Sequence, residues 1–360
     1  MSAVFDVESA PPQASKAALG RPIAIWLLVC CAMVFGMIVV GGATRLTHSG
    51  LSITEWQPIL GTLPPLTAGD WQQAFDKYKA TPEYQKVNSG MSLDEFKGIF
   101  WWEYCHRLLG RTIGTVFLLP LLWFWWRGMI GPPLRRRLIA IFILGGLQGA
   151  LGWYMVQSGL VDEPRVSQFR LTAHLLLAFT LYAAMLWTAL GLLRSSVAPD
   201  TVGRSRLGGL AWLVLAVVLY MVTTGGFVAG IRAGFAYNTF PLMNGHVVPP
   251  EIMMIEPWWK NFFYNMATVQ FDHRAGAWLL AVLVPALWWR SRAPGVSSRV
   301  RHAADVLLGM LAVQIALGIS TLLLVVPVGL AATHQAGAVL LFSAALNLVH
   351  ALRSGRAADR

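Results

Sequence analysis

The chain has 360 residues, of which 56% are hydrophobic and only 12% charged, and its formal net charge is +11. This composition is that of a polytopic membrane protein and excludes an ordinary soluble domain. A strongly basic balance is also a feature of nucleic-acid-binding proteins. Here the basic residues are distributed in a way that membrane topology explains, and no nucleic-acid partner is expected.

Eight apolar segments are long enough to cross a hydrocarbon core of about 30 Å as helices. Residues 1–22 precede the first and are rich in Ala, Pro and Ser, as expected of a tail. The polar loop 44–100 contains Asp70–Tyr78, whose spacing predicts an amphipathic helix on the membrane surface. Ser92 and Glu95 have the capping-box pattern, which predicts a helix start near Leu93. The segments are about 23–43, 104–126, 135–157, 171–193, 207–230, 271–289, 303–326 and 329–352.

The charges on the loops predict the topology. With the N-terminus in the cytoplasm, the inner segments hold sixteen of the 28 Lys and Arg residues but only five of the 17 Asp and Glu residues. The positive-inside rule then places both ends of the chain, 1–22 and 353–360, in the cytoplasm. We expect a multi-pass protein of the cell inner membrane, surrounded by membrane lipid, whose long loops face the periplasm.

The chain contains an internal repeat of about 160–185 residues. The two halves start on the same side, so the repeat is parallel. It predicts two tandem, pseudo-symmetric four-helix bundles, over residues 23–195 and 196–352. The matching pairs are Gly41-Gly42 with Gly225-Gly226, His106-Arg107 with His273-Arg274, Gln148–Gly152 with Gln314–Gly318, and His174 with His334.

Four histidines lie at one predicted depth, each on an even-numbered segment. At 1.5 Å per residue, each is about 24–30 Å from the inner end of its segment, near the outer boundary of the hydrocarbon core. No odd-numbered segment has an interior histidine, and histidines with unrelated structural roles would not sort in this way. The four are His106, His174, His273 and His334.

Two imidazoles on facing helices of a bundle suit the two axial positions of haem iron. We therefore expect two haem sites, one between His106 and His174 and one between His273 and His334. Zinc or copper would need three or more converging ligands, and no such cluster is visible. The three cysteines form no CxxC or CxxCH motif, so covalent haem attachment is not expected. A transporter with four functional histidines is an alternative, and it predicts a protein without a Soret band.

The two halves differ beside these histidines. Glu103 lies three residues before His106, whereas Gln270, which cannot titrate, lies three residues before His273. A carboxylate there could move protons or stabilise a developing cation, which predicts one reactive site and one electron-transfer or structural site. A local ion pair of Glu103 with Arg107 is the alternative. Several arginines could bind haem propionates or simply reach the interface; they are Arg107, Arg111, Arg165, Arg170 and Arg274.

A family resemblance rests on a long series of motifs. Gly41–Ser52 reads GGATRLTxSGLS and Glu103–Arg111 reads ExxHRxxGR, and His174, His273 and His334 follow. Over about residues 23–352 the chain resembles the haem A synthase family in its proteobacterial and mitochondrial form. Another branch of that family has cysteine pairs in the outer loops, and this chain lacks them.

The resemblance implies an enzyme with eight helices that oxidises the C8 methyl group of haem O to the formyl group of haem A, for cytochrome oxidase assembly. It implies that His106 and His174 flank the substrate haem with Glu103 assisting catalysis, and that His273 and His334 ligate haem b. A haem O synthase, an electron donor and a second copy of the chain are candidate partners. The main rival is a di-haem b, quinol-linked electron-transfer cytochrome, which needs the same histidines but no substrate chemistry.

Overall fold

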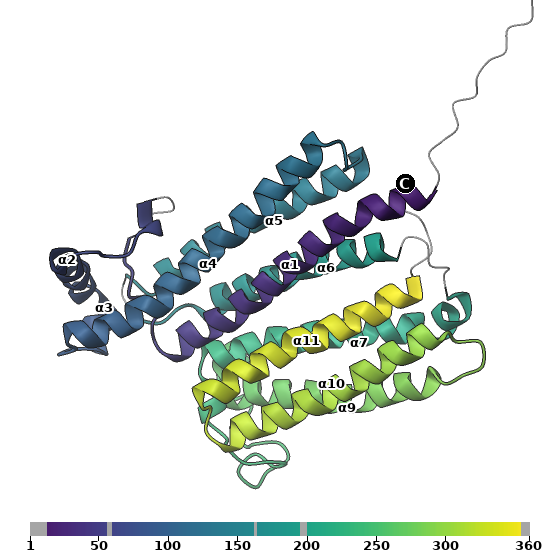
Figure 1. Cartoon of the computed structure of the whole chain (residues 1–360). Coiled ribbons are helices and arrows are strands. Elements are labelled where there is room, and N and C mark those ends of the chain that lie inside the picture. The colour runs from purple at the N-terminus through teal and green to yellow at the C-terminus, as the bar shows by residue number, and fades with distance from the viewer. Residues whose placement is uncertain (1–12, 56–59, 162–163, 195–199, 354–360) are drawn as a thin grey trace, which may run out of the picture.

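The computed structural model describes residues 13–55, 60–161, 164–194 and 200–353, and its long elements are all helices (Figure 1). Residues 1–12 and 354–360 of the predicted tails lie outside the described residues. The first helix, α1 (Gln13–Leu46), begins well before the predicted segment at residue 23. Part of the predicted tail is therefore helical, because Gln, Ala, Lys and Leu between residues 13 and 19 favour helix even without an apolar run.

The other long helices follow the predicted apolar segments and extend beyond most of their ends. They are α4 (Leu93–Trp126), α5 (Pro132–Gln157), α6 (Gln168–Leu193), α7 (Thr201–Gly230), α9 (Met266–Arg290), α10 (Ser298–Leu323) and α11 (Val328–Arg353). Short helices occupy the connections. They are α2 (Ala68–Lys79), α3 (Pro82–Lys86) and α8 (Asn261–Tyr264), with 3-10 turns η1 (Leu60–Thr62), η2 (Ala233–Phe235) and η3 (Trp258–Lys260).

Seven helices of the described chain are long and apolar enough to span a membrane. They are α1, α4, α5, α6, α7, α10 and α11. The predicted eighth span, α9, is 25 residues long but is not among them. Its first turns carry Gln270, Asp272 and Arg274, which lower its mean hydropathy.

The loop between α1 and α4 folds against the protein. Thr67 caps α2 and Ser92 caps α4, each in a capping box, so the predicted start of α4 at Leu93 is confirmed. The predicted helix over Asp70–Tyr78 is confirmed as part of α2, and its place on the membrane surface stays a prediction. Its apolar face packs against the first turns of α4, where Phe75 lies against Phe96 with ring centroids 5.1 Å apart.

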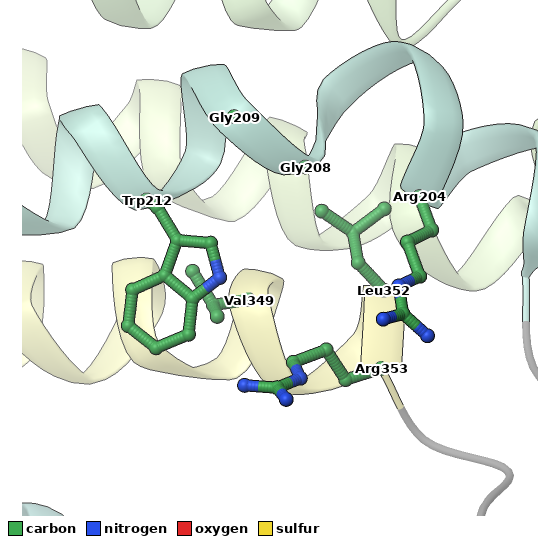
Figure 2. A pocket seen from close by; sticks show the side chains of 7 residues that line it. All are labelled: Arg204, Gly208, Gly209, Trp212, Val349, Leu352 and Arg353. Carbon is green, nitrogen blue, oxygen red and sulfur yellow. The ribbon is translucent and has the colours of Figure 1, made fainter.

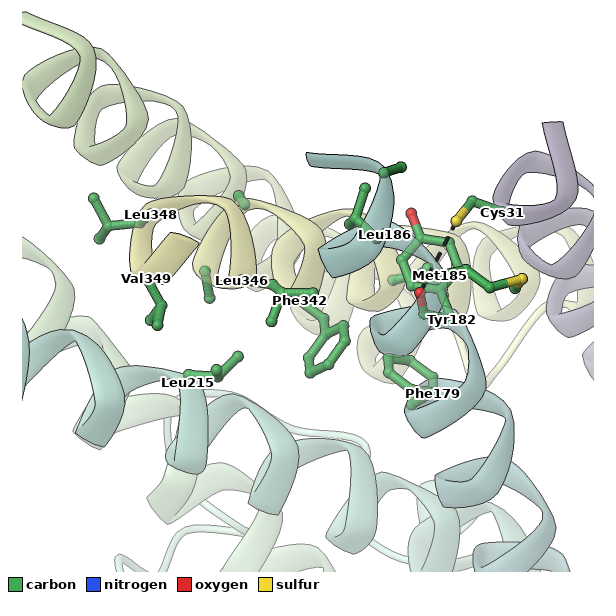
Figure 3. Close-up of a cluster of buried hydrophobic side chains, with 14 of the residues drawn as sticks. Cys31, Phe179, Tyr182, Met185, Leu186, Leu215, Phe342, Leu346, Leu348 and Val349 are labelled. Atoms are coloured by element: carbon green, nitrogen blue, oxygen red, sulfur yellow. Dashed lines mark hydrogen bonds between the residues drawn. The ribbon is translucent and has the colours of Figure 1, made fainter. Parts of the chain in front are cut away.

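The long helices lie in two groups that follow the chain (Figure 1). In the first group, α4 and α6 each contact both α1 and α5; in the second, α9 and α11 each contact both α7 and α10. The groups meet where α11 contacts α1 and α6, and where α6 contacts α7. Figure 3 shows part of the buried core at this junction. Phe179 of α6 packs edge-on against Phe342 of α11, and the Tyr182 hydroxyl lies 2.9 Å from Ser343 Oγ.

Candidate functional site

Each of the four histidines lies against a glycine of a neighbouring helix. A Cβ atom added at any of these glycines would lie 2.9–3.3 Å from the imidazole ring, closer than ordinary van der Waals contact. Only a residue without a side chain lets the ring approach the helix in this way. The pairs are Gly41 with His106, Gly152 with His174, Gly225 with His273, and Gly318 with His334.

Each group of helices carries two of the four histidines. His106 of α4 and His174 of α6 belong to the first group, and His273 of α9 and His334 of α11 belong to the second. In each group, the two helices that carry the pair both contact the other two helices. The imidazoles of a pair therefore project from opposite corners of a four-helix group.

The ring nitrogens of the first pair have few partners. The amide Nε2 of Gln148, on α5, lies 3.3 Å from His174 Nε2 and donates to the His174 carbonyl over 3.0 Å. His174 Nδ1 and Gln148 Oε1 are buried without a hydrogen-bond partner among the described residues. Buried polar atoms in proteins are nearly always paired, so these two atoms point to a missing ligand or solvent molecule.

The second pair is held differently. Thr224 Oγ1, on α7, lies 2.9 Å from His273 Nδ1 and fixes the orientation of that ring. Gln314 Nε2 donates to the His334 carbonyl over 3.0 Å, and His334 Nδ1 is buried without a described partner. By the offset that relates Gly41 to Gly225, the first-half counterpart of Thr224 is Val40, whose side chain cannot form a hydrogen bond.

Glu103 is buried and its carboxylate accepts four hydrogen bonds. Oε2 accepts from Ser52 Oγ and from the backbone N–H of Ile53, both over 2.8 Å. Oε1 accepts from Arg107, over 3.0 Å from Nε and 2.6 Å from NH2. The predicted i,i+4 ion pair is thus confirmed, and it also fastens the loop after α1 to α4.

The second half repeats this arrangement without the charge. Gln270 Oε1 accepts from Arg274 NH2 over 2.9 Å, and Gln270 Nε2 donates to the Ala233 carbonyl over 2.7 Å. Arg274 NH2 also donates to the Tyr237 carbonyl over 2.9 Å. Glu103 and Gln270 therefore have the same structural task, and only Glu103 adds a negative charge one helical turn from a histidine.

Three arginines considered for carboxylate binding have protein partners. The three guanidinium nitrogens of Arg107 bind Glu103 and the carbonyls of Ile53 and Glu55. Arg170 donates to the Tyr154 carbonyl and lies 3.7 Å above that ring. Arg274 is bound as above, although its Nε has no described partner.

In addition to Glu103, a second buried carboxyl lies in the segment between α1 and α4. Glu83, on α3, accepts from the Tyr78 hydroxyl over 3.3 Å, and Asn88 donates to that hydroxyl over 2.7 Å. Burial raises the pKa of Glu83 to about 7; the bond from Tyr78 opposes this shift and the charge of Glu103 adds to it.

Two imidazoles from opposite corners of a helical group, each backed by a glycine and one of them with a buried, unpaired Nδ1, suit the axial positions of a haem iron. Among the described residues, no three His, Cys, Asp or Glu side chains gather closely enough to hold a single metal ion.

Comparison with known proteins identifies the family of the chain. The model of the COX15-CtaA family, described as cytochrome oxidase assembly protein, matches residues 24–346. The chain belongs to the COX15-CtaA family. Its curated relatives include heme A synthase of Nitrosospira multiformis, 62% identical over 94% of this chain and 95% of the relative, and heme A synthase of Nitrosomonas eutropha, 56% identical over 90% and 92%. Heme A synthase of Rhodospirillum centenum is 50% identical over 96% and 92%.

Two residues of this COX15-CtaA site were not singled out from the sequence. Thr224 directly precedes the repeated Gly-Gly pair, and Gln148 opens the repeated segment Gln148–Gly152. Alignment of the two halves gives a signal for Gln148, which matches Gln314, but none for Thr224, whose counterpart is Val40.

A hollow in the described structure lies away from the histidines. It has a volume of about 350 Å³ and is lined by Arg204, Trp212 and Arg353, among others (Figure 2). Arg353 follows His334 by nineteen positions on α11, about 28 Å along the helix. This hollow is therefore not part of the histidine sites of this COX15-CtaA protein.

Proposed function

We propose that this chain is a haem A synthase, an oxidoreductase that converts haem O to haem A for cytochrome oxidase assembly. The observation that carries the proposal is the difference between the two histidine sites: the arginine-bound residue one helical turn before the histidine is the buried carboxylate Glu103 in the first half and the neutral Gln270 in the second. The similarity to heme A synthases over nearly the whole chain supports it.

The proposed architecture has eight membrane spans in two tandem bundles, residues 23–195 and 196–352, with α9 as the span that composition alone does not reveal. The contacts of α9 with α7 and α10 match those of α4 with α1 and α5 and so support this arrangement. The charge distribution supports cytoplasmic termini, with the histidines toward the periplasmic side of the cell inner membrane.

Each half of the chain binds a different haem. The C-terminal half holds haem b between His273 and His334, and the N-terminal half binds haem O between His106 and His174. Thr224 supports this division, because a hydrogen bond at Nδ1 orients an imidazole for a permanent metal bond. His106 has Val40 in place of that threonine, and Gln148 contacts His174 Nε2, as suits a site whose porphyrin enters and leaves.

The reaction replaces a methyl group by a formyl group. Written as a half-reaction with water as the oxygen source, R–CH₃ + H₂O gives R–CHO + 4H⁺ + 4e⁻, and an electron acceptor outside this chain must take up the four electrons. Haem b, when bound, supplies a one-electron redox centre within the same protein. Glu103 provides fixed negative charge beside the substrate pocket, which stabilises an electron-poor carbon and favours loss of its protons. Arg107 and Ser52 hold the carboxylate in place.

The rival function, a di-haem electron-transfer cytochrome, shares the histidines but makes no haem A. The test is to express the chain with a haem O synthase in a host that makes no haem A and to extract the pigments. Haem A in the extract is the expected result, and its loss is expected in Glu103→Gln protein at matched levels. Two bound b-type haems without any haem A would overturn the proposal.

A further inference from the structure

Arg45 lies at the outer end of α1, above the first histidine pair. It follows Gly41, which faces the His106 ring, by four residues, and Gly42, which faces Gln335 of α11, by three. At 100° per residue, the side chain of Arg45 leaves α1 in a direction between those of the two glycines. It is half-buried and leaves the helix about 6 Å further out than Gly41.

Two further basic groups join Arg45 at this junction of the halves. Arg45 and Arg232 interact electrostatically, and Arg232 NH2 lies 3.1 Å from His48 Nδ1. His48 and Arg232 are equivalent by the Gly41–Gly225 offset, and both have left-handed backbones, with φ of +54° and +59°. Burial, followed by the charges of Arg232 and Arg45, holds the pKa of His48 below its usual value. A neutral His48 can accept the bond from Arg232.

This outer cluster, Arg45, His48 and Arg232, has no matching acid. Among the described residues, no carboxylate forms an ion pair with either arginine. Like charges held together in a half-buried place repel each other, and an anionic ligand would relieve the repulsion. The outer arginines Arg107 and Arg170 are already bound to protein groups, so they are less suited to receive such a ligand.

We propose that Arg45, supported by Arg232 and His48, binds a propionate carboxylate of the porphyrin held between His106 and His174. The proposal rests on the proposed function, since it takes the first histidine pair as the substrate site. The counterpart of Arg45 in the second half is Ala229, so the contact belongs to the substrate haem alone. Because a guanidinium can bind a carboxylate through two parallel hydrogen bonds, Arg45 also fixes which edge of the porphyrin faces the membrane surface.

The test uses the purified full chain with its resident haem and two probes, ferric protohaem and its dimethyl ester. The ester keeps the ring and the iron but lacks the carboxylates. Titration is followed by the difference Soret spectrum. Wild-type protein is expected to bind protohaem about tenfold or more tightly than the ester, as hydrogen bonds to charged groups predict. Arg45→Met should bring the ratio close to one, and Arg45→Lys should restore part of it.

The control is Arg127→Met. Arg127 lies at the C-terminal end of α4, where its guanidinium lies over the Trp123 ring. This variant should keep the wild-type ratio. Equal affinities of wild-type protein for the two probes would overturn the inference whether or not any variant folds. An unchanged affinity ratio in Arg45→Met would overturn it too.

His106→Ala separates the proposal for Arg45 from the proposed function. If it leaves probe binding unchanged, the substrate site itself is misplaced; if it abolishes binding while Arg45→Met keeps the ratio, only the role of Arg45 fails.

Discussion

Glu103 and Gln270 accept hydrogen bonds from equivalent arginines and fasten equivalent loops. Glu103→Gln therefore places at the first site a group that the second site already accommodates. We expect this variant to fold and bind porphyrin but to lose haem A formation by a factor of about 10²–10⁴, the usual contribution of a general acid or base. Pigment analysis at matched protein levels measures it.

The reciprocal variant, Gln270→Glu, is the matched control for that experiment. It adds a carboxylate beside the other histidine pair and should leave haem A formation largely intact. Normal conversion by Glu103→Gln would instead mean that the carboxylate only fastens residues 52–55 to α4.

Thr224 gives a second prediction for a single residue. Its hydroxyl holds the His273 ring from outside the haem pocket, so Thr224→Val should weaken retention of haem b by about 10–100-fold, as loss of an outer partner of a metal ligand typically does. The midpoint potential should also shift. Redox titration and haem loss to apomyoglobin measure the two effects. Haem retention as in wild type would show that the ring is positioned by packing alone.

At the scale of helices, glycine allows the histidine-bearing helices to approach their neighbours. Gly152→Ala and Gly318→Ala would each place a methyl group about 3 Å from an imidazole carbon. Because overpacking of this kind costs about 1–3 kcal/mol, we expect lower haem content in the affected half. Gly149→Ala on α5 and Gly309→Ala on α10 are controls, since nothing lies within 4 Å of a Cβ there. Equal haem content in all four variants would refute the role of these contacts.

The outer helices α2 and α3 give a prediction about pH. In the unfolded chain the pKa of Glu83 is near its ordinary value of 4.5, and in the folded protein it is about 7. Folding thus favours the protonated form of Glu83. The contribution of Glu83 to the free energy of unfolding is therefore fully present below about pH 4.5 and is lost as the pH rises through 7. The protection factors of amide hydrogens in residues 68–86, which take out the base-catalysed rise of intrinsic exchange, should be lower at pH 8 than at pH 6. Glu83→Gln should remove this difference, and persistence of the difference would assign it to another group.

For the whole molecule, the sequence predicted the helical class and the positions of the seven helices that are apolar enough to span a membrane. These features follow from apolar length, which is a local quantity, whereas the pairing of the four histidines stays a prediction. The start of α4 at Leu93 followed from Ser92 and Glu95 for the same reason.

Contacts between distant segments could not be predicted in this way. The binding of Glu103 to Ser52, the cover of α2 by α4 and the meeting of Arg232 with His48 each join residues that no local spacing relates. The polar outer turns of α9 also separate it from the other long helices by composition, although its contacts match those of α4.

The central claim is that each half of the molecule holds one porphyrin between its own two histidines. The most direct measurement is the haem b content of purified protein, expressed without a supply of haem O, for wild type and for each histidine replaced singly by alanine. The account predicts that His273→Ala and His334→Ala lose the resident haem b, while His106→Ala and His174→Ala keep it. Retention of haem b in both His273→Ala and His334→Ala would contradict it.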